Sequence, residues 1–234
     1  MKIEVLFPEY ASLYGDNGNI MYLKACLPKA TFIQTSMRDE PRFLKEKVNL
    51  VYMGAMSEKA QEKIIRKLMP WKEQIRRRID EGMPFLMTGN AMEVFYDHIQ
   101  DGNRKIPGLG LIPYHAVRDM DHRFNGLFLG EFRGKPLVGC KTQFTMAYGG
   151  DENCCLAKAL RGIGINKGSD LEGYRKDHFF GTNLVGPLLV LNPEFTKYLL
   201  HIMGADQTRL AFEKEVTQAY ECRLKEFEDP KTEV

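Results

Sequence analysis

The chain has 234 residues, of which 44% are hydrophobic and 27% are charged. That is enough apolar material for one α/β domain with a buried core that needs neither disulfides nor metal ions. Its 33 basic and 31 acidic residues are mixed along the chain and leave a formal charge of +2, so the sequence lacks the basic surface that is typical of nucleic-acid-binding proteins.

The N-terminal residues predict a strand rather than a signal peptide, and no run of about 18 apolar residues could span a membrane. We therefore expect a cytoplasmic protein without membrane contact. The five cysteines are odd in number and lack metal-ligand spacing, so we interpret them as reduced thiols and expect no metal or other cofactor. They are Cys26, Cys140, Cys154, Cys155 and Cys222.

In the first half of the chain, strand-like apolar runs alternate with helix-length amphipathic segments. This alternation is typical of crossover units on a mainly parallel sheet. We expect Ser57 to cap a long helix that runs into the 70s, and Pro70 to kink or end it. The other predicted elements are, in order, a strand at 3–7, a helix at 17–27, and strands at 30–34, 49–53 and 84–87.

The second half of the chain begins with a change of pattern. From residue 114 to 150, short apolar runs are separated by glycines and charged turns, which predicts a small antiparallel add-on to the parallel sheet. Apolar residues then recur at helical spacing from Phe212 to Phe227, which predicts a closing helix. We expect a single domain over residues 1–229 and a frayed tail over 230–234.

Residues 84–95 predict a buried strand, a tight turn and the start of a helix, a place where many α/β enzymes carry a nucleophile. The residue at the turn is Thr88. Three more stretches lie where the carboxyl end of a predicted strand meets a loop, the usual ligand position in an open α/β sheet. They are 13–20, 53–56 and 181–189. The first of these favours a helix entry over a phosphate-binding loop, because its glycine spacing matches neither common nucleotide motif.

The order and spacing of these stretches resemble class I glutamine amidotransferases of the cobyric acid synthase (CobB/CobQ) type, and in particular the glutaminase subunits of lipid II isoglutaminyl synthase (GatD type). Residues 13–20 resemble the family's opening loop and helix, and 107–113 its Gly-Leu-Gly-Leu segment. Residues 162–173 and 180–193 are similar to the stretch that leads through the family's catalytic histidine. The resemblance implies a flavodoxin-like α/β fold and a place in peptidoglycan or cobalamin biosynthesis.

Two residues depart from the family's catalytic motifs. Members hydrolyse glutamine with a cysteine in a Cys-Gly-Gly-Tyr-Gln context and a histidine in a Gly-Thr-Tyr-Leu-His-Gly-Pro context. The resemblance places Thr88 at the nucleophile position and Val185 at the histidine position. Acyl transfer needs an ionised nucleophile and a base that takes and returns its proton. Threonine ionises much less readily than cysteine and valine holds no proton, so by analogy with a serine protease triad we expect a loss of about a millionfold in rate.

Five further positions are expected to line the pocket or to form the oxyanion hole. The resemblance places Gly54 and Ala55 where members have consecutive glycines with oxyanion-binding amides. Gly89 and Asn90 follow the nucleophile position, and Gln143 lies in the segment that matches the family's Gly-Phe-Glu-Asn motif.

The sequence therefore predicts a glutamine amidotransferase-like protein that is inactive as a glutaminase and acts as a ligand-binding or partner subunit. The resemblance implies an ATP-dependent partner, a Mur-ligase-like synthetase subunit, and glutamine or a related small molecule as a ligand.

Two alternatives stay open. One is an active glutaminase subunit that supplies ammonia to a lipid II or cobyric acid type amide ligase, with His178 or a displaced thiol of Cys140, Cys154 or Cys155 in the catalytic role. The other is an enzyme with different chemistry in the same cleft.

Overall fold

The structure, a computed structural model, describes all 234 residues and is built on a six-stranded sheet. The strand order is β13-β14-β4-β3-β1-β2, and every neighbouring pair is parallel except β13 with β14. The predicted mainly parallel sheet is confirmed. Its strands are β1 (Lys2–Leu6), β2 (Thr31–Thr35), β3 (Leu50–Met53), β4 (Phe85–Thr88), β13 (Tyr174–Lys176) and β14 (Phe179–Thr182).

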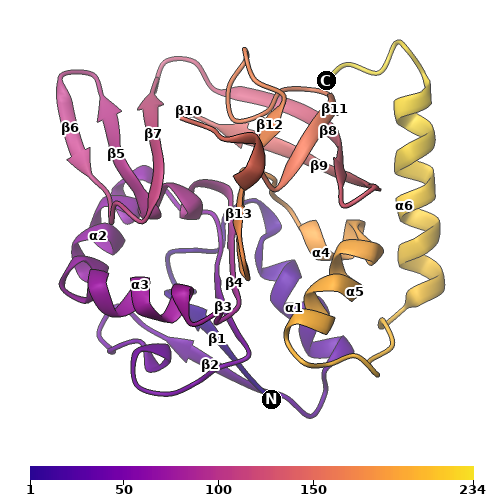
Figure 1. The fold of residues 1–234 in the computed structure, drawn as a ribbon. Coiled ribbons are helices and arrows are strands. Elements are labelled where there is room, and N and C mark those ends of the chain that lie inside the picture. The colour runs from indigo at the N-terminus through magenta and orange to yellow at the C-terminus, as the bar shows by residue number, and fades with distance from the viewer.

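Helices cover both faces of this sheet (Figure 1). The α2 and α3 helices lie on one face, and α1, α4 and α5 lie on the other, while α6 stands outside α4 and α5. None of the helices is long and apolar enough to cross a membrane. Their bounds are α1 (Asn17–Cys26), α2 (Glu58–Leu68), α3 (Lys72–Asp80), α4 (Leu188–Leu191), α5 (Pro193–Ile202) and α6 (Glu213–Glu228).

The long helix predicted after residue 57 is two helices joined by a short turn. The Ser57 hydroxyl accepts a hydrogen bond from the Ala60 amide at 3.3 Å and caps α2. Pro70 lies in the 3-10 turn Met69–Trp71 that separates α2 from α3, because proline cannot continue the hydrogen bonding of a helix interior.

The core has two parts, one on each face of the sheet, because successive strand residues point to opposite sides. In β3, Val51 and Met53 belong to the part beneath α2 and α3, whereas Leu50 and Tyr52 belong to the other part. All four are buried, which is why this strand has the continuous apolar run typical of a parallel sheet.

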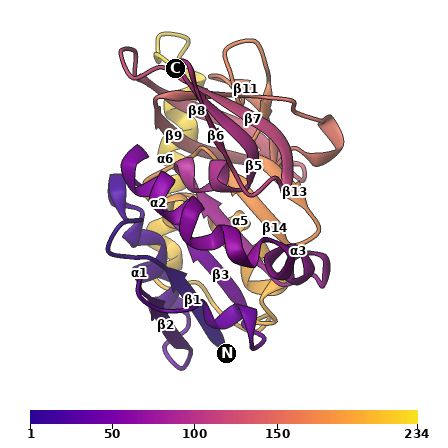
Figure 2. The same ribbon diagram turned by 90° about the vertical axis from the view of Figure 1, so that its left-hand side faces the viewer.

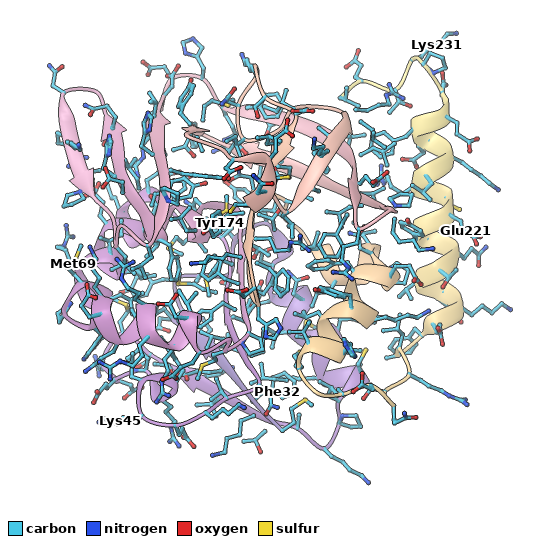
Figure 3. The ribbon with its side chains drawn as sticks, viewed as in Figure 1. Phe32, Lys45, Met69, Tyr174, Glu221 and Lys231 are labelled. Carbon is cyan, nitrogen blue, oxygen red and sulfur yellow. The ribbon has the colours of Figure 1, made fainter.

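Two smaller sheets stand over the carboxyl ends of the parallel strands (Figures 1 and 2). Their orders are β10-β7-β5-β6 and β12-β11-β8-β9. Tyr174 of β13 (labelled in Figure 3) joins the first of these sheets to the main sheet, because its ring packs edge-on against Tyr114 of β7 and against Phe179 of β14. Their strands are β5 (Tyr96–Asp101), β6 (Arg104–Pro107), β7 (Ile112–Arg118), β8 (Phe124–Phe132), β9 (Lys135–Gln143), β10 (Thr145–Tyr148), β11 (Ala157–Arg161) and β12 (Leu171–Glu172).

The two smaller sheets extend beyond the predicted residues 114–150 in both directions, from Tyr96 to Glu172. Their neighbouring strands are antiparallel, as predicted, except for β5 and β7, which pair in parallel. The strands β5 and β6 have one face open to solvent and are therefore rich in polar and charged residues. They lack the apolar runs from which the other strands are predicted.

One further segment differs from expectation. The helix after β4 is a 3-10 helix, Gly89–Phe95, with a nearly all-buried sequence and no polar face to give helical periodicity. After Asp229, the carbonyl of Thr232 accepts a hydrogen bond from the Arg161 guanidinium of β11 at 2.7 Å, and the fraying of residues 230–234 stays a prediction.

Candidate functional site

The turn after β4 lies at the carboxyl edge of the main sheet, beneath the two smaller sheets. Thr88 ends the strand in an extended conformation, with φ −110° and ψ 148°. The left-handed residue of the turn is Gly89, with φ +60°, so the chain bends one residue beyond Thr88. The Thr88 side chain is fully buried, and its hydroxyl donates to Oδ2 of Asp16 at 2.7 Å.

The Asp16 carboxylate connects the stretches that the sequence analysis singled out. Besides the Thr88 hydroxyl, it accepts hydrogen bonds from the amide of Ala55 at 2.8 Å and from the amide of Gly186 at 3.2 Å. Burial raises the pKa of Asp16, and these three hydrogen bonds oppose that rise because they stabilise the charged form. One carboxylate therefore connects the opening loop, the loop after β3 (residues 54–57), the β4 turn and the loop after β14.

Val185 faces the turn from the loop after β14. It is buried, and its backbone forms a bridge with Cys140 of β9. A Cβ atom added to Gly89 would lie 3.0 Å from Cγ1 of Val185 and 2.7 Å from Cβ of Ala55. The predicted histidine position is thus adjacent to the turn, but its isopropyl group has no atom that can accept a proton.

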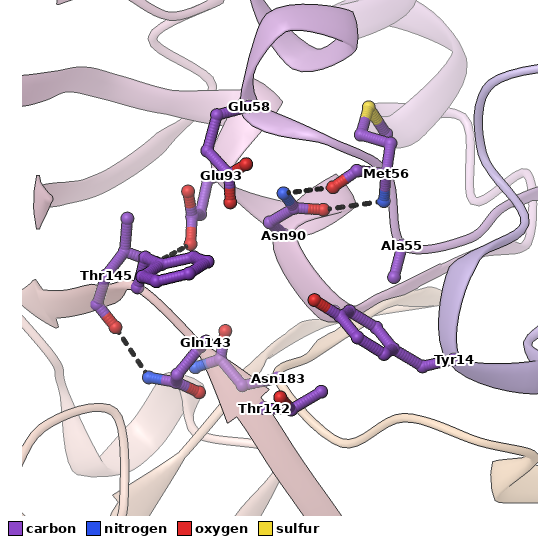
Figure 4. A pocket seen from close by; sticks show the side chains of 12 residues that line it. Tyr14, Ala55, Met56, Glu58, Asn90, Glu93, Thr142, Gln143, Thr145 and Asn183 are labelled. Atoms are coloured by element: carbon purple, nitrogen blue, oxygen red, sulfur yellow. Dashed lines mark hydrogen bonds between the residues drawn. The ribbon is translucent and has the colours of Figure 1, made fainter. Parts of the chain in front are cut away.

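Ala55, Gly89, Asn90 and Gln143 line one small pocket at this edge (Figure 4). Gly54 lies behind it, where an added Cβ would meet the carbonyl of Ala11 at 2.8 Å. Thr88 and Val185 do not line the pocket; the other lining residues are Tyr14, Met56, Glu58, Glu93, Thr142, Phe144, Thr145 and Asn183. The cavity volume is about 20 Å³, room for about one water molecule.

Asn90 closes the pocket on the side of the loop after β3. Its Oδ1 accepts from the Met56 amide at 2.9 Å, and its Nδ2 donates to the Met56 carbonyl at 2.8 Å. Together with the contact between Ala55 and Asp16, this leaves the amides of both residues after Gly54 with partners inside the protein.

Sequence reasoning missed a buried carboxyl group in the pocket wall. Glu93 accepts hydrogen bonds from the Thr145 hydroxyl and from Nε2 of Gln61. Burial raises the pKa of Glu93, and these hydrogen bonds and the charge of Arg118 act in the opposite direction. A polar residue in the otherwise apolar run from Ala91 to Phe95 was the signal that could have identified it.

Gln143 points into the pocket from the end of β9. Its Nε2 donates to the carbonyl of Thr145 at 2.6 Å, while its buried Oε1 has no hydrogen-bond partner in the protein. That oxygen and the Glu93 and Glu58 carboxyl groups give the pocket a lining rich in acceptors, and no lysine, arginine or histidine lines it.

The alternative catalytic groups lie elsewhere. His178 precedes β14 at the edge of the sheet opposite the pocket, where its ring contacts the carbonyl of Gly82 at 2.8 Å. Cys140, Cys154 and Cys155 do not line the pocket. Burial raises the pKa of the Cys140 and Cys155 thiols, which favours the unreactive protonated form. No group of three or more His, Cys, Asp or Glu side chains is arranged to hold a metal ion.

The amino-acid sequence is similar to two curated proteins. It is 23% identical over 219 residues to the GatD subunit of lipid II isoglutaminyl synthase (glutamine-hydrolyzing) from Staphylococcus aureus, with 92% of this chain and 89% of that protein covered. It is 24% identical over 199 residues to the GatD subunit from Streptococcus pneumoniae, with 82% of this chain and 76% of that protein covered. No family model matches the chain.

Solved structures show the same fold at lower identity. A crystal structure of a glutamine amidotransferase superposes with a TM-score of 0.56 at 16% identity, over 86% of this chain and 98% of the other. The glutaminase domain of Trypanosoma brucei CTPS with bound acivicin gives a TM-score of 0.54 at 9% identity, over 88% and 94%. The resemblance to GatD-type glutamine amidotransferases and the predicted α/β fold are confirmed.

Proposed function

We propose that this chain is a glutamine amidotransferase-like subunit that does not hydrolyse glutamine and that acts as a ligand-binding or partner subunit of an amide ligase. The GatD relatives are subunits of a lipid II synthase, which supports a ligase partner, of Mur-ligase-like type, and a peptidoglycan rather than a cobalamin context. We place the complex in the cytoplasm, because all five cysteines are free thiols, the state that a reducing compartment maintains.

The observation that supports the loss of hydrolysis is the environment of Thr88. Its hydroxyl faces Asp16 in the protein interior and does not line the pocket. We assign Thr88 to the nucleophile position and Val185 to the histidine position, and no imidazole or thiol lies in the pocket lining to replace the missing pair. Without a nucleophile and a base, a bound glutamine would keep its amide.

A second function is favoured by one contact. Asp16 accepts the Thr88 hydrogen bond at 2.7 Å, and burial raises the pKa of Asp16, as expected for a general base. In that case the chain would be an active glutaminase subunit that supplies ammonia to its ligase, after a movement that brings Thr88 into the pocket.

Ammonia release from L-glutamine separates the two functions. We expect no release above that of a Thr88→Val variant, alone or with the synthetase subunit added, while the GatD subunit of Staphylococcus aureus with its own partner serves as the active control. Glutamine-dependent release that disappears in Thr88→Val and in Asp16→Asn would overturn the proposal in favour of the second function.

The partner is tested separately by size-exclusion chromatography of the chain mixed with a Mur-ligase-like synthetase from the same cell. We expect a stable complex, and separate elution at micromolar concentrations of both proteins would contradict the partner role.

A further inference from the structure

The backbone of Met56 presents a hydrogen-bond donor and an acceptor to a single side chain. Its amide donates to Oδ1 of Asn90 at 2.9 Å, and its carbonyl accepts from Nδ2 of the same residue at 2.8 Å (Figure 4). A primary carboxamide is the side-chain group that both accepts and donates in this way. A carboxylate would leave the Met56 carbonyl facing another acceptor.

The space around this pair is already filled. The cavity beside Asn90 has a volume of about 20 Å³, which suits about one water molecule and not an additional carboxamide. The neighbouring Ala55 amide is held by Asp16 at 2.8 Å. A ligand that carries a carboxamide can therefore reach the Met56 backbone only by displacing the Asn90 side chain.

We propose that the Met56 backbone is a binding site for a primary carboxamide, and that the Asn90 side chain occupies it as a built-in ligand. The inference deepens the proposed function and rests on it, because it takes the pocket to be a glutamine-type crevice. The Asn90 side chain then blocks the site to free glutamine. It also fills the crevice when no small molecule is bound.

Because Asn90 belongs to the chain itself, its side chain competes effectively with a free ligand for the Met56 backbone. An attached group competes at an effective concentration of about millimolar or more, and Asn90 is also held through its main chain, since its carbonyl accepts from Nε2 of Gln61 at 2.6 Å. Gly89 contributes by its φ of +60°, which turns the chain so that Asn90 lies over Met56. Removal of the Asn90 carboxamide would leave this backbone anchor in place.

Isothermal titration with L-glutamine, acetamide and L-glutamate tests the assignment on the full chain. For Asn90→Gly we expect the Kd of glutamine and of acetamide to be lower than for the wild type by a factor of about ten or more. Glutamate should gain much less, because it cannot donate to the Met56 carbonyl. Asn103→Gly, the same change in the exposed turn between β5 and β6, is the matched control and should bind as the wild type does.

Two results would overturn the inference: wild-type protein that binds glutamine as tightly as Asn90→Gly, or a folded Asn90→Gly that gains no affinity. Asn90→Ala is the second variant. If neither variant folds, exchange of the Asn90 side-chain amide protons in the wild-type protein decides, with slow exchange supporting the inference and free exchange overturning it.

Ammonia measured in the same samples distinguishes a failure of the role assigned to Asn90 from a failure of the proposed function. Wild-type protein that binds glutamine tightly without releasing ammonia contradicts only the role of Asn90, whereas ammonia release by the wild type contradicts the proposed function.

Discussion

We assign Thr88 to the nucleophile position on the resemblance alone, whereas its contacts are those of a structural residue. Its hydroxyl donates to Asp16 and lies 3.2 Å from the hydroxyl of Tyr52, and all of these groups are buried. The sequence motifs identified Thr88 but not Asp16 as its partner, because the two residues are 72 positions apart and no local pattern records a contact at that separation. The same holds for Gln61 and Thr145, which hold Glu93.

Thr88→Ala should lower the free energy of unfolding by about 1–3 kcal/mol, because it removes a donor from a buried carboxylate, while Thr88→Ser should retain most of the stability. Urea unfolding measures both. In the wild type, the hydrogen bond from Thr88 lowers the pKa of Asp16 and partly offsets the rise caused by burial. Without this hydrogen bond, the pKa of Asp16 is higher still in the alanine variant. A raised carboxyl pKa contributes stability that is present at low pH and is lost as the pH rises through it. The deficit of Thr88→Ala should therefore shrink as the pH falls, and a variant as stable as the wild type at pH 7 would contradict this role.

At the scale of secondary-structure elements, the parallel strands were predictable and parts of the rest were not. The strands β3 and β4 are buried on both faces, so each begins with a continuous apolar run. The β1 strand is buried too, although Glu4 interrupts its apolar residues. The α6 helix has apolar residues at helical spacing, but only Val216 and Phe227 are buried in it. The spacing of apolar residues predicted the helix correctly but predicted more burial than the structure shows. Such spacing indicates which residues could face the rest of the protein, and not how closely the rest of the protein packs against them.

The end of α6 is held mainly by Phe227 and by Arg161, whose guanidinium donates to the carbonyls of Phe227 and Asp229. In Phe227→Ala we expect hydrogen exchange of residues 221–234 to rise about tenfold or more, since local opening costs less free energy than global unfolding. Exchange in β1, β3 and β4 should not change. Glu221→Ala, which alters an outward-pointing side chain of the same helix (Figure 3), is the control. Equal exchange in both variants would show that other contacts hold the helix.

At the scale of the whole molecule, a buried ion pair within one of the smaller sheets is linked to the main sheet through the carboxylate of Glu172. The Lys141 ammonium of β9 contacts the Glu172 carboxylate of β12, and both side chains are almost completely buried. Oε1 of Glu172 in turn accepts from the Thr182 hydroxyl and the Asn183 amide, both at 2.8 Å. Burial lowers the pKa of Lys141, and the charge of Glu172 and its hydrogen bond oppose that shift. The wall of the pocket that contains Gln143 and Asn183 depends on this link.

Lys141→Met should lower the free energy of unfolding by about 3–5 kcal/mol, because it leaves the Glu172 charge buried without a partner. Lys141→Met with Glu172→Gln should lose less, since a neutral side chain at position 172 can still accept from Asn183. Chemical denaturation of the two single variants and the double variant gives the coupling energy. If the free energy of unfolding lost in the double variant equals the sum of the losses in the two single variants, the charge pairing of Lys141 with Glu172 does not stabilise this contact.

The close packing around Gly89 also restricts how this crevice can change by mutation. A methyl group at position 89 would lie within 2.7 Å of the Ala55 side chain and 3.0 Å of Val185, so a larger residue there is tolerated only after residue 55 or 185 has become smaller or has moved. The order of substitutions then matters, and a change that is harmful alone becomes acceptable after another. Such sign epistasis limits the order in which residues 55, 89 and 185 can be replaced by larger ones during evolution.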